Sequence, residues 1–258
     1  MLISVVIPLY NKAPFVVRCL ESLVVQTHQE LEIIVVDDES SDGSVEEAEK
    51  VKDDRIKIIR REANGGCAAA RNDGMMAARG KFIALQDADD FSHSTRMAVQ
   101  LAAIRHYGIP TCKTRRIDIT RVAQEQYQQE FQNPLNPQAK AGSFMSLMFP
   151  RLPRVLENDS MRLMEELAFM ADLAYVWGPC VNLRRPLYCF DNTDQQNRIY
   201  PKRKMTDEWF AQRHLAFKHN AKLWRTWNRS REARLGDAKI VAESVTRDIR
   251  SGAFFNEP

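Results

Sequence analysis

Residues 2–38 read LISVVIPLYNKAPFVVRCLESLVVQTHQELEIIVVDD, and this stretch decides the expected fold. Its first part, Leu2 to Pro8, is a short apolar run rich in β-branched residues, which predicts a buried strand. From Pro14 to Val24 apolar residues recur at helical spacing, and Pro14 stands where a first helical turn tolerates proline. A second apolar run, Leu31 to Val36, ends in the acidic pair Asp37-Asp38. The stretch therefore predicts a strand, a helix and a second strand.

The same alternation continues along the chain. Apolar runs at Ile56 to Ile59 and at Lys81 to Leu85 predict two more strands, and the Ala-rich segment Cys67 to Arg79 predicts a helix between them. The charged segment Glu46 to Asp54 is expected to form a solvated helix. Strands that alternate with helices imply parallel βαβ units. We therefore expect an α/β fold, a doubly wound and mostly parallel sheet flanked by helices.

Beyond Pro110 the pattern is weaker. A helix is expected through Met161 to Val176, ended by Gly178-Pro179. Val181 to Leu183 and Leu187 to Phe190 are expected to be two short strands. From Met205 onward two helices fit best.

Composition indicates an ordinary globular protein. The 258 residues are 44% hydrophobic and 28% charged, which supports a sizeable core and excludes a chain disordered throughout. The five cysteines are odd in number and form no CxxC pair, a pattern typical of reduced thiols in the cytosol. The first residues lack the features of a signal peptide, and no apolar run approaches a membrane span. We therefore expect a cytoplasmic protein.

The net charge of +3 is unevenly distributed. Residues 201–258 hold 13 Lys and Arg against 7 Asp and Glu, whereas the rest of the chain is mildly acidic. Within 201–234 the basic residues are interleaved with Trp209, Trp224 and Trp227. Such a segment can lie on the anionic inner face of a membrane, or its tryptophans can simply pack on the catalytic domain. Nucleic acid is the least favoured partner.

The acidic triplet Asp87-Ala88-Asp89 follows the strand that ends at Leu85. Two carboxylates spaced two residues apart on a tight turn can converge on one hard divalent cation, Mn²⁺ or Mg²⁺, and on a ribose hydroxyl. Such an ion stabilises a departing diphosphate. Acidic turns after strands are also common as solvated loops, so the triplet alone is weak support for a metal site.

The pair Asp37-Asp38 is ambiguous on its own. An aspartate at the end of a strand of this kind often meets a ribose or a base edge, but it can equally cap the following helix. A dinucleotide-binding Rossmann site is excluded at the first turn, because PLYN (residues 8–11) does not match G-x-G-x-x-G.

Four motifs in a fixed order are more specific. They are SVVIPLYN (residues 4–11), VVDDESSD (35–42), NGG with ARN (64–72) and DADD (87–90). Together they closely resemble the donor half of the family-2 glycosyltransferases, which have the GT-A fold, and in particular bacterial lipopolysaccharide and capsule sugar transferases. The resemblance covers about the first hundred residues.

The resemblance implies roles for individual residues of a nucleotide-sugar site. Pro8 and Tyr10 are similar to residues that line the base pocket, and Asp38 to the carboxylate that reads the base, where it suits the ring N–H of uracil. Arg71 resembles the cation near the base and the diphosphate. Asp87 resembles the residue on the ribose side and Asp89 the direct metal ligand.

Inversion by direct displacement requires a general base for the acceptor hydroxyl. The segment ENDSMRLMEE (residues 157–166) is similar to the region that carries this base in the family. Glu166 stands where the base, commonly aspartate, is expected, and Glu165 is its rival. A salt-bridged helix face is the third reading.

The expected organisation is a donor-binding half at 1–108, an acceptor-binding half of the same domain at 109–200, and a basic helical extension at 201–258. The expected activity is transfer of a sugar to a hydroxyl of a glycan or lipid-linked acceptor. A UDP-sugar is the preferred donor, and guanosine and thymidine donors stay open. Two alternatives stay open: a non-catalytic nucleotide-binding scaffold with the same fold, and a sugar nucleotidyltransferase. The latter usually carries a Gly-rich basic loop after the first strand, which Pro8-Leu9-Tyr10-Asn11-Lys12 does not match.

Overall fold

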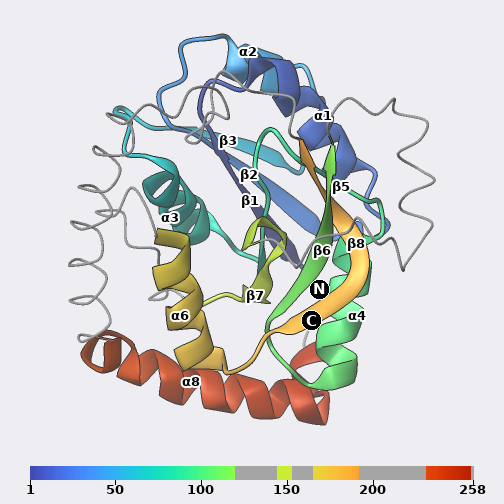
Figure 1. Cartoon of the computed structure of the whole chain (residues 1–258), viewed down its shortest axis with the longest axis vertical. Coiled ribbons are helices and arrows are strands. Elements are labelled where there is room, and N and C mark those ends of the chain that lie inside the picture. The colour runs from blue at the N-terminus through green and yellow to red at the C-terminus, as the bar shows by residue number, and fades with distance from the viewer. Residues whose placement is uncertain (120–143, 153–164, 192–230, 257–258) are drawn as a thin grey trace, which may run out of the picture.

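The computed structural model describes residues 1–119, 144–152, 165–191 and 231–256. In this part of the chain eight strands form one sheet in the order β3-β2-β1-β4-β7-β6-β8-β5 (Figure 1). The strands are β1 (Ile3–Leu9), β2 (Leu31–Asp37), β3 (Ile56–Arg60), β4 (Phe82–Leu85), β5 (Phe91–Ser92), β6 (Cys112–Ile119), β7 (Met148–Pro150) and β8 (Val181–Asp191). The helices are α1 (Ala13–Val24), α2 (Ser44–Ala48), α3 (Cys67–Ala77), α4 (Arg96–Tyr107), α6 (Glu165–Trp177) and α8 (Arg231–Ser251), with 3-10 turns η1 (Phe144–Ser146) and η2 (Ala253–Phe255).

The first half of the sheet is parallel, and its strands end at the same edge. Strands β3, β2, β1 and β4 all run in the same direction. Leu9 pairs with Asp37, and the Gln86 N–H donates to the Val6 carbonyl at 3.1 Å just beyond β4. The segments that follow β1, β2 and β4 therefore leave the sheet at the same edge.

The second half of the sheet is mixed. Strand β7 is antiparallel to β4 and to β6, β8 is parallel to β6, and β5 is antiparallel to β8. The fold class is confirmed as α/β, with a mostly parallel sheet flanked by helices.

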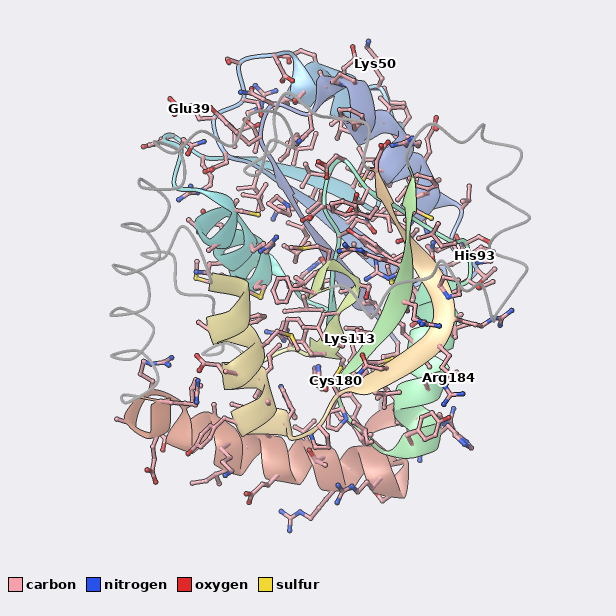
Figure 2. All side chains as sticks on the ribbon, viewed as in Figure 1. Glu39, Lys50, His93, Lys113, Cys180 and Arg184 are labelled. Carbon is pink, nitrogen blue, oxygen red and sulfur yellow. The ribbon has the colours of Figure 1, made fainter. Side chains whose placement is uncertain are left out.

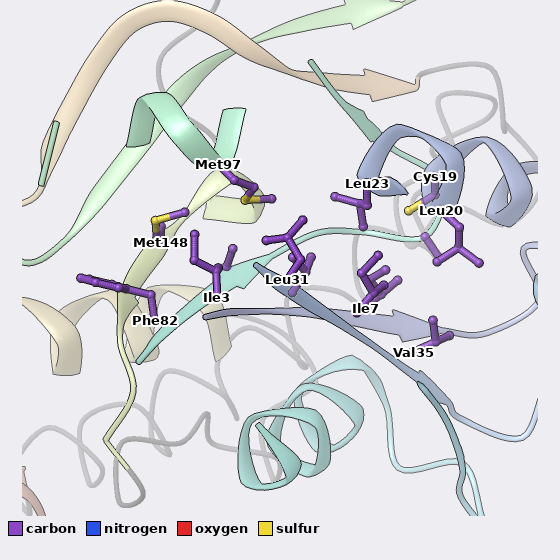
Figure 3. Packing of buried hydrophobic residues seen from close by; sticks show 14 of the residues in the cluster. Ile3, Ile7, Cys19, Leu20, Leu23, Leu31, Val35, Phe82, Met97 and Met148 are labelled. Atoms are coloured by element: carbon purple, nitrogen blue, oxygen red, sulfur yellow. The ribbon is translucent and has the colours of Figure 1, made fainter. Parts of the chain in front are cut away.

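Helices cover both faces of the sheet. Successive side chains of a strand point to opposite sides, so each strand contributes apolar side chains to a core on either face. Ile7 of β1 lies near Leu20 of α1 on one face, and Ile3 belongs to the same core cluster, near Met148 (Figure 3). Val6, between them in β1, belongs to the core on the other face, with Phe169 of α6. Helix α8 crosses the end of the molecule opposite α1 and α2 (Figure 1).

Two local expectations were wrong. The helix expected from Glu46 to Asp54 is only α2, Ser44–Ala48. Asp53 accepts a hydrogen bond from the Arg55 N–H at 2.9 Å, a local side-chain contact that competes with helical pairing. The two short strands expected after Val181 are the single strand β8. Its pairing with β6 is irregular near Pro186, which has no N–H to give to a ladder.

A tight turn between α3 and β4 explains the glycine at position 80. A Cβ added to Gly80 would lie 2.6 Å from the backbone nitrogen of Ser4 and 2.9 Å from the Leu2 carbonyl oxygen. Backbone cannot yield as a flexible side chain can, so Gly80→Ala is expected to lower the free energy of unfolding by about 2–3 kcal/mol. Denaturant titration measures this.

Gly236 provides the matched control, because it lies within α8 and a Cβ there meets no atom within 4 Å. Gly236→Ala is expected to raise the free energy of unfolding by about 0.5 kcal/mol. Equal effects of the two substitutions would contradict the close approach at Gly80.

The same turn binds a buried carboxylate, that of Glu32. It accepts hydrogen bonds from the Ser4 hydroxyl, from the Gly80 N–H at 3.0 Å and from Arg79 Nε at 2.9 Å. Burial raises the pKa of Glu32, but the hydrogen bonds from Ser4, Arg79 and Gly80 outweigh burial, so its pKa lies below the usual 4.5. The stability from this depressed pKa is present above pH 4.5 and is lost as the pH falls through the folded-state pKa.

Glu32→Gln is therefore expected to flatten the decline of the unfolding free energy between about pH 6 and about pH 3. Urea titrations at the two pH values measure the slope. An unchanged slope would show that Glu32 does not contribute.

Candidate functional site

The loops after β1 and β2 are bound to each other by side chains. The Asn11 N–H donates to Ser40 Oγ at 3.0 Å, and the Ser41 N–H donates to Asn11 Oδ1 at 2.9 Å. The Lys12 N–H donates to Ser44 Oγ at 2.7 Å. Asn11 has a φ of 50°, a left-handed conformation that asparagine tolerates better than most residues. These contacts fix the rim of the sheet where the expected base pocket lies.

Pro8 and Tyr10, the residues expected to line that pocket, lie at the end of β1. Pro8 pairs with Val36 of β2 and is partly buried. The Tyr10 side chain is 49% exposed, which is unusual for a large aromatic residue and leaves its ring available to a ligand.

Asp38 is buried and holds the loop before α3. Its carboxylate accepts hydrogen bonds from the Gly65 N–H at 2.9 Å and the Gly66 N–H at 2.8 Å, and it pairs with Arg61. The Asn64 side chain donates to the Asp38 carbonyl at 2.9 Å. A carboxylate offers about four acceptor positions, so these three contacts leave about one for a ligand.

The neighbouring acidic residue strengthens this arrangement. Glu39, labelled in Figure 2, accepts a hydrogen bond from the Asn64 N–H at 3.0 Å. Arg61 also pairs with Asp73 of α3 at 2.7 Å. The loop at 64–66 is thus held by the end of β2, and Arg61 links the end of β2 to α3.

Three carboxylates gather just beyond β4. Oxygen atoms of Asp87, Asp89 and Asp90 lie within 4.8 Å of one another. Asp87 and Asp89 are partly exposed, whereas Asp90 is fully buried. Carboxylate oxygens are hard ligands of the kind that Mg²⁺ and Mn²⁺ prefer, so this ligand set fits a divalent cation.

Arg71 of α3 contacts the acidic cluster. Its guanidinium lies 3.3 Å from Asp87 Oδ1, and the residue is only 2% exposed. It donates to Met145 Sδ at 3.1 Å and lies over the Phe144 ring, 5.2 Å from the centroid. The structure therefore brings together Arg71 and Asp87, two residues that the sequence placed in one site.

Tyr188 of β8 orders the turn that carries the cluster. Its hydroxyl donates to Asp90 Oδ2 at 2.7 Å and accepts from the Asp87 N–H at 3.1 Å. The Asp191 N–H donates to Asp90 Oδ1 at 2.8 Å. Burial raises the pKa of Asp90 well above its usual range, and the charges of Asp89 and Asp87 raise it further.

A buried arginine of α4 supports this turn from within the core. Arg96 is fully buried and donates to the Leu85 carbonyl at 2.8 Å and to Gln86 Oε1 at 2.9 Å. It also lies over the Tyr188 ring, 5.0 Å from the centroid. Burial lowers the pKa of Arg96 to about 10, so the side chain remains a cation at neutral pH.

Two further cations contact the acidic turn. Lys12 Nζ lies 2.9 Å from Asp89 Oδ2. Arg18 of α1 pairs with Asp191 and donates to the Asp89 carbonyl at 3.4 Å. Sequence reasoning singled out neither of them, nor Arg96. Lys12 could have been found, because it directly follows the Tyr10-Asn11 motif; a single buried arginine leaves no signal in the sequence.

Three expectations fall outside what the structure describes. Glu165 and Glu166 begin α6, but their side chains lie outside the described part. The basic segment 201–230 lies outside it as well. A contact of α6 with the site is nevertheless described, because the Phe169 ring lies 6.1 Å from the Phe144 ring that Arg71 covers.

Among the described residues no helix combines the length and the apolar character needed to cross a membrane.

Comparison with known proteins decides the family. Residues 4–155, more than half of the chain, match the family described as Glycosyl transferase family 2. This chain belongs to glycosyltransferase family 2. The matched residues contain β2, β3 and β4, all of β1 except its first residue, and the whole acidic cluster.

Curated relatives of this family 2 member match between a third and two fifths of it. Glycosyltransferase GlyG of Streptococcus pneumoniae is 44% identical over 91 residues, which are 34% of this chain and 30% of GlyG. The Escherichia coli protein WfaP, named UDP-Glc:alpha-D-GlcNAc-diphosphoundecaprenol beta-1,3-glucosyltransferase, is 36% identical over 100 residues, 39% of this chain and 40% of WfaP. The chain thus matches less than half of either relative.

Solved structures of low sequence identity share the fold of this family 2 member. TarS of Staphylococcus aureus, residues 1–349 in complex with UDP, aligns with a TM-score of 0.61 at 20% identity and covers 74% of this chain and 60% of that TarS 1–349 chain. The mannosyltransferase PcManGT of Pyrobaculum calidifontis, in complex with GDP-Man and Mn²⁺, aligns with a TM-score of 0.57 at 18% identity, over 99% of this chain and 76% of PcManGT.

Proposed function

We propose that the chain is an inverting glycosyltransferase that moves a sugar from a UDP-sugar to a hydroxyl of a glycan or lipid-linked acceptor in bacterial surface polysaccharide synthesis. The observation that carries the proposal is the acidic cluster of Asp87, Asp89 and Asp90, with Arg71 against Asp87, at the carboxyl edge of a parallel sheet in a family 2 chain. Ligands of open α/β sheets bind at this edge.

In this proposal Asp89 holds Mn²⁺ or Mg²⁺, and Asp87 faces the ribose. The bound ion supplies positive charge that stabilises the departing diphosphate. Arg71, buried and held by Asp87 and Met145, presents a guanidinium of fixed orientation to the same diphosphate. Asp90 takes no direct part: it is fully buried, and its hydrogen bonds with Tyr188 and the Asp191 N–H keep the turn in shape.

The base of the nucleotide is assigned to the pocket of Pro8, Tyr10 and Asp38. The exposed Tyr10 ring can stack on a base, and the remaining acceptor position of Asp38 suits the ring N–H of uracil. The name of WfaP includes UDP-Glc, and TarS was crystallised with UDP, which favours uridine; PcManGT was crystallised with GDP-Man, so guanosine is the competing base.

The general base is assigned to Glu166, with Glu165 as its rival. Helix α6 begins with these residues, and Phe169, three positions after Glu166, contacts the Phe144 ring beneath Arg71. The start of α6 therefore lies near the site. Residues 1–108 would bind the donor and 109–200 the acceptor, and residues 201–234 would rest on the inner face of a cytoplasmic membrane that holds a lipid-linked acceptor.

Thermal unfolding against a panel of nucleoside diphosphates, with and without Mn²⁺, tests the proposal. A ligand at about 100 times its dissociation constant stabilises the folded chain by about 2.7 kcal/mol, a rise in midpoint of roughly 5–10 °C. We expect UDP to raise the midpoint only with Mn²⁺, and Asp89→Ala to abolish the rise. Asp248→Ala, which removes an exposed carboxylate of α8, is the matched control and should leave the rise unchanged.

The alternatives give other results. A sugar nucleotidyltransferase would release pyrophosphate, whereas a glycosyltransferase releases a nucleoside diphosphate. A scaffold protein could bind UDP but would release no product from a UDP-sugar. No shift with any nucleotide would remove the physical basis for the donor site.

A further inference from the structure

Lys12 forms an ion pair with the expected metal ligand. Its Nζ lies 2.9 Å from Asp89 Oδ2, and the two side chains are 16% and 24% exposed. We propose that Lys12 is a diphosphate-binding residue. Before metal binds, its ammonium neutralises Asp89. When a divalent cation takes the place of the ammonium at Asp89, Lys12 becomes free to bind the diphosphate of the donor. This inference depends on the proposed function, because it requires that Asp89 hold the ion.

The position of Lys12 restricts the motion to its side chain. Its N–H donates to Ser44 Oγ at 2.7 Å, and its carbonyl accepts from the Phe15 N–H at 2.9 Å and the Val16 N–H at 3.1 Å. The backbone of this residue is therefore fixed at the start of α1. The lysine stem has several rotatable bonds, so the ammonium can change partner while the loop stays in place.

The charges of the cluster make Lys12 the group that must move when a divalent cation binds Asp89. Arg71 lies against Asp87, and the buried Asp90 is hydrogen-bonded to Tyr188 and to the Asp191 N–H. A divalent cation on Asp89 would face the Lys12 ammonium, a like charge, at short range. The cation and the ammonium therefore oppose each other unless an anion joins them.

A diphosphate is the anion that this edge of the sheet receives in the proposed reaction. Its oxygens can bridge a metal ion and an ammonium, since lysine binds phosphate as a point charge. Lys12 also stands directly at the N-terminus of α1, whose first turn contains no acidic residue. The helix dipole therefore adds to the attraction for an anion there.

The proposal predicts effects of opposite sign for one substitution. Without the ammonium, Asp89 is open to metal, so Lys12→Met should tighten binding of Mn²⁺ alone by about five- to tenfold. With saturating Mn²⁺, the same variant should bind UDP about tenfold more weakly, because a phosphate ligand is lost. A purely structural lysine would weaken both steps.

Electron paramagnetic resonance of free Mn²⁺ and titration calorimetry with UDP measure the two constants on the full chain. Lys12→Arg, which keeps the charge, should retain the weaker Mn²⁺ binding of the unaltered chain. Lys50→Met is the matched control: Lys50, labelled in Figure 2, pairs with Glu47 at 2.6 Å on the surface, and its loss should change neither constant.

The outcomes separate this inference from the proposed function. If the unaltered chain binds Mn²⁺ and UDP but Lys12→Met leaves Mn²⁺ affinity unchanged or weakens it, the role of Lys12 is overturned and the function stands. Unchanged UDP affinity in Lys12→Met would overturn it as well. If the unaltered chain binds neither ligand, both proposals fail.

Discussion

Asp89→Asn is expected to lower the rate of sugar transfer about a thousandfold. The substitution removes the charge of the proposed metal ligand, and a metal ion contributes several kcal/mol of stabilisation to a transition state in which charge develops on a leaving group. A loss of about 4 kcal/mol corresponds to that factor in rate. Release of nucleoside diphosphate, from the donor whose base the thermal panel identifies, measures the rate.

The fold should tolerate this change. Asp89 is 24% exposed, its side chain pairs with Lys12, and asparagine has nearly the same shape. The free energy of unfolding should therefore stay within about 1 kcal/mol of the starting value. Asp248→Asn is the control for a lost surface charge and should keep the full rate. A rate reduced less than tenfold in Asp89→Asn would remove Asp89 from the metal site.

Arg96→Met is expected to lower the free energy of unfolding by about 3–5 kcal/mol. The guanidinium is fully buried and donates to the Leu85 carbonyl at 2.8 Å, to Gln86 Oε1 at 2.9 Å and to Gln100 Oε1 at 3.0 Å. Methionine would leave buried acceptors unpaired, each at about 1–3 kcal/mol. Denaturant titration measures the loss.

An opposing effect has to be weighed here. Burying a cation is itself unfavourable, as the lowered pKa of Arg96, about 10, indicates, and apolar replacement of buried charges is in some proteins neutral. The unpaired acceptors should dominate, because their partners stay in place. Arg105→Met removes an exposed arginine of the same helix and should change stability by less than about 1 kcal/mol. A comparably small effect at Arg96 would mean that the core rearranges around methionine.

The sequence by itself determined the parallel half of the molecule and the edge of the sheet at which the site is proposed. Apolar runs of strand length and helical spacing are local patterns, and they identified β1 to β4 with the helices α1 and α3. The topology of parallel strands then places the segments after β1, β2 and β4 at one edge. The motifs at that edge predicted Arg71 and Asp87 in one site, and the structure places them 3.3 Å apart.

Only the tertiary structure decided what each charge of that site contacts. Lys12 and Asp89 are far apart in the sequence, as are Arg61 and Asp38, and Arg96 reaches the end of β4 from a helix that the sequence did not predict. The mixed half of the sheet, with β7 antiparallel to its neighbours, was also not predicted. The physical reason is common to all of these. Periodicity and propensity act between near neighbours in the chain, whereas ion pairs, buried hydrogen bonds and strand order depend on which distant segments the packed core brings together.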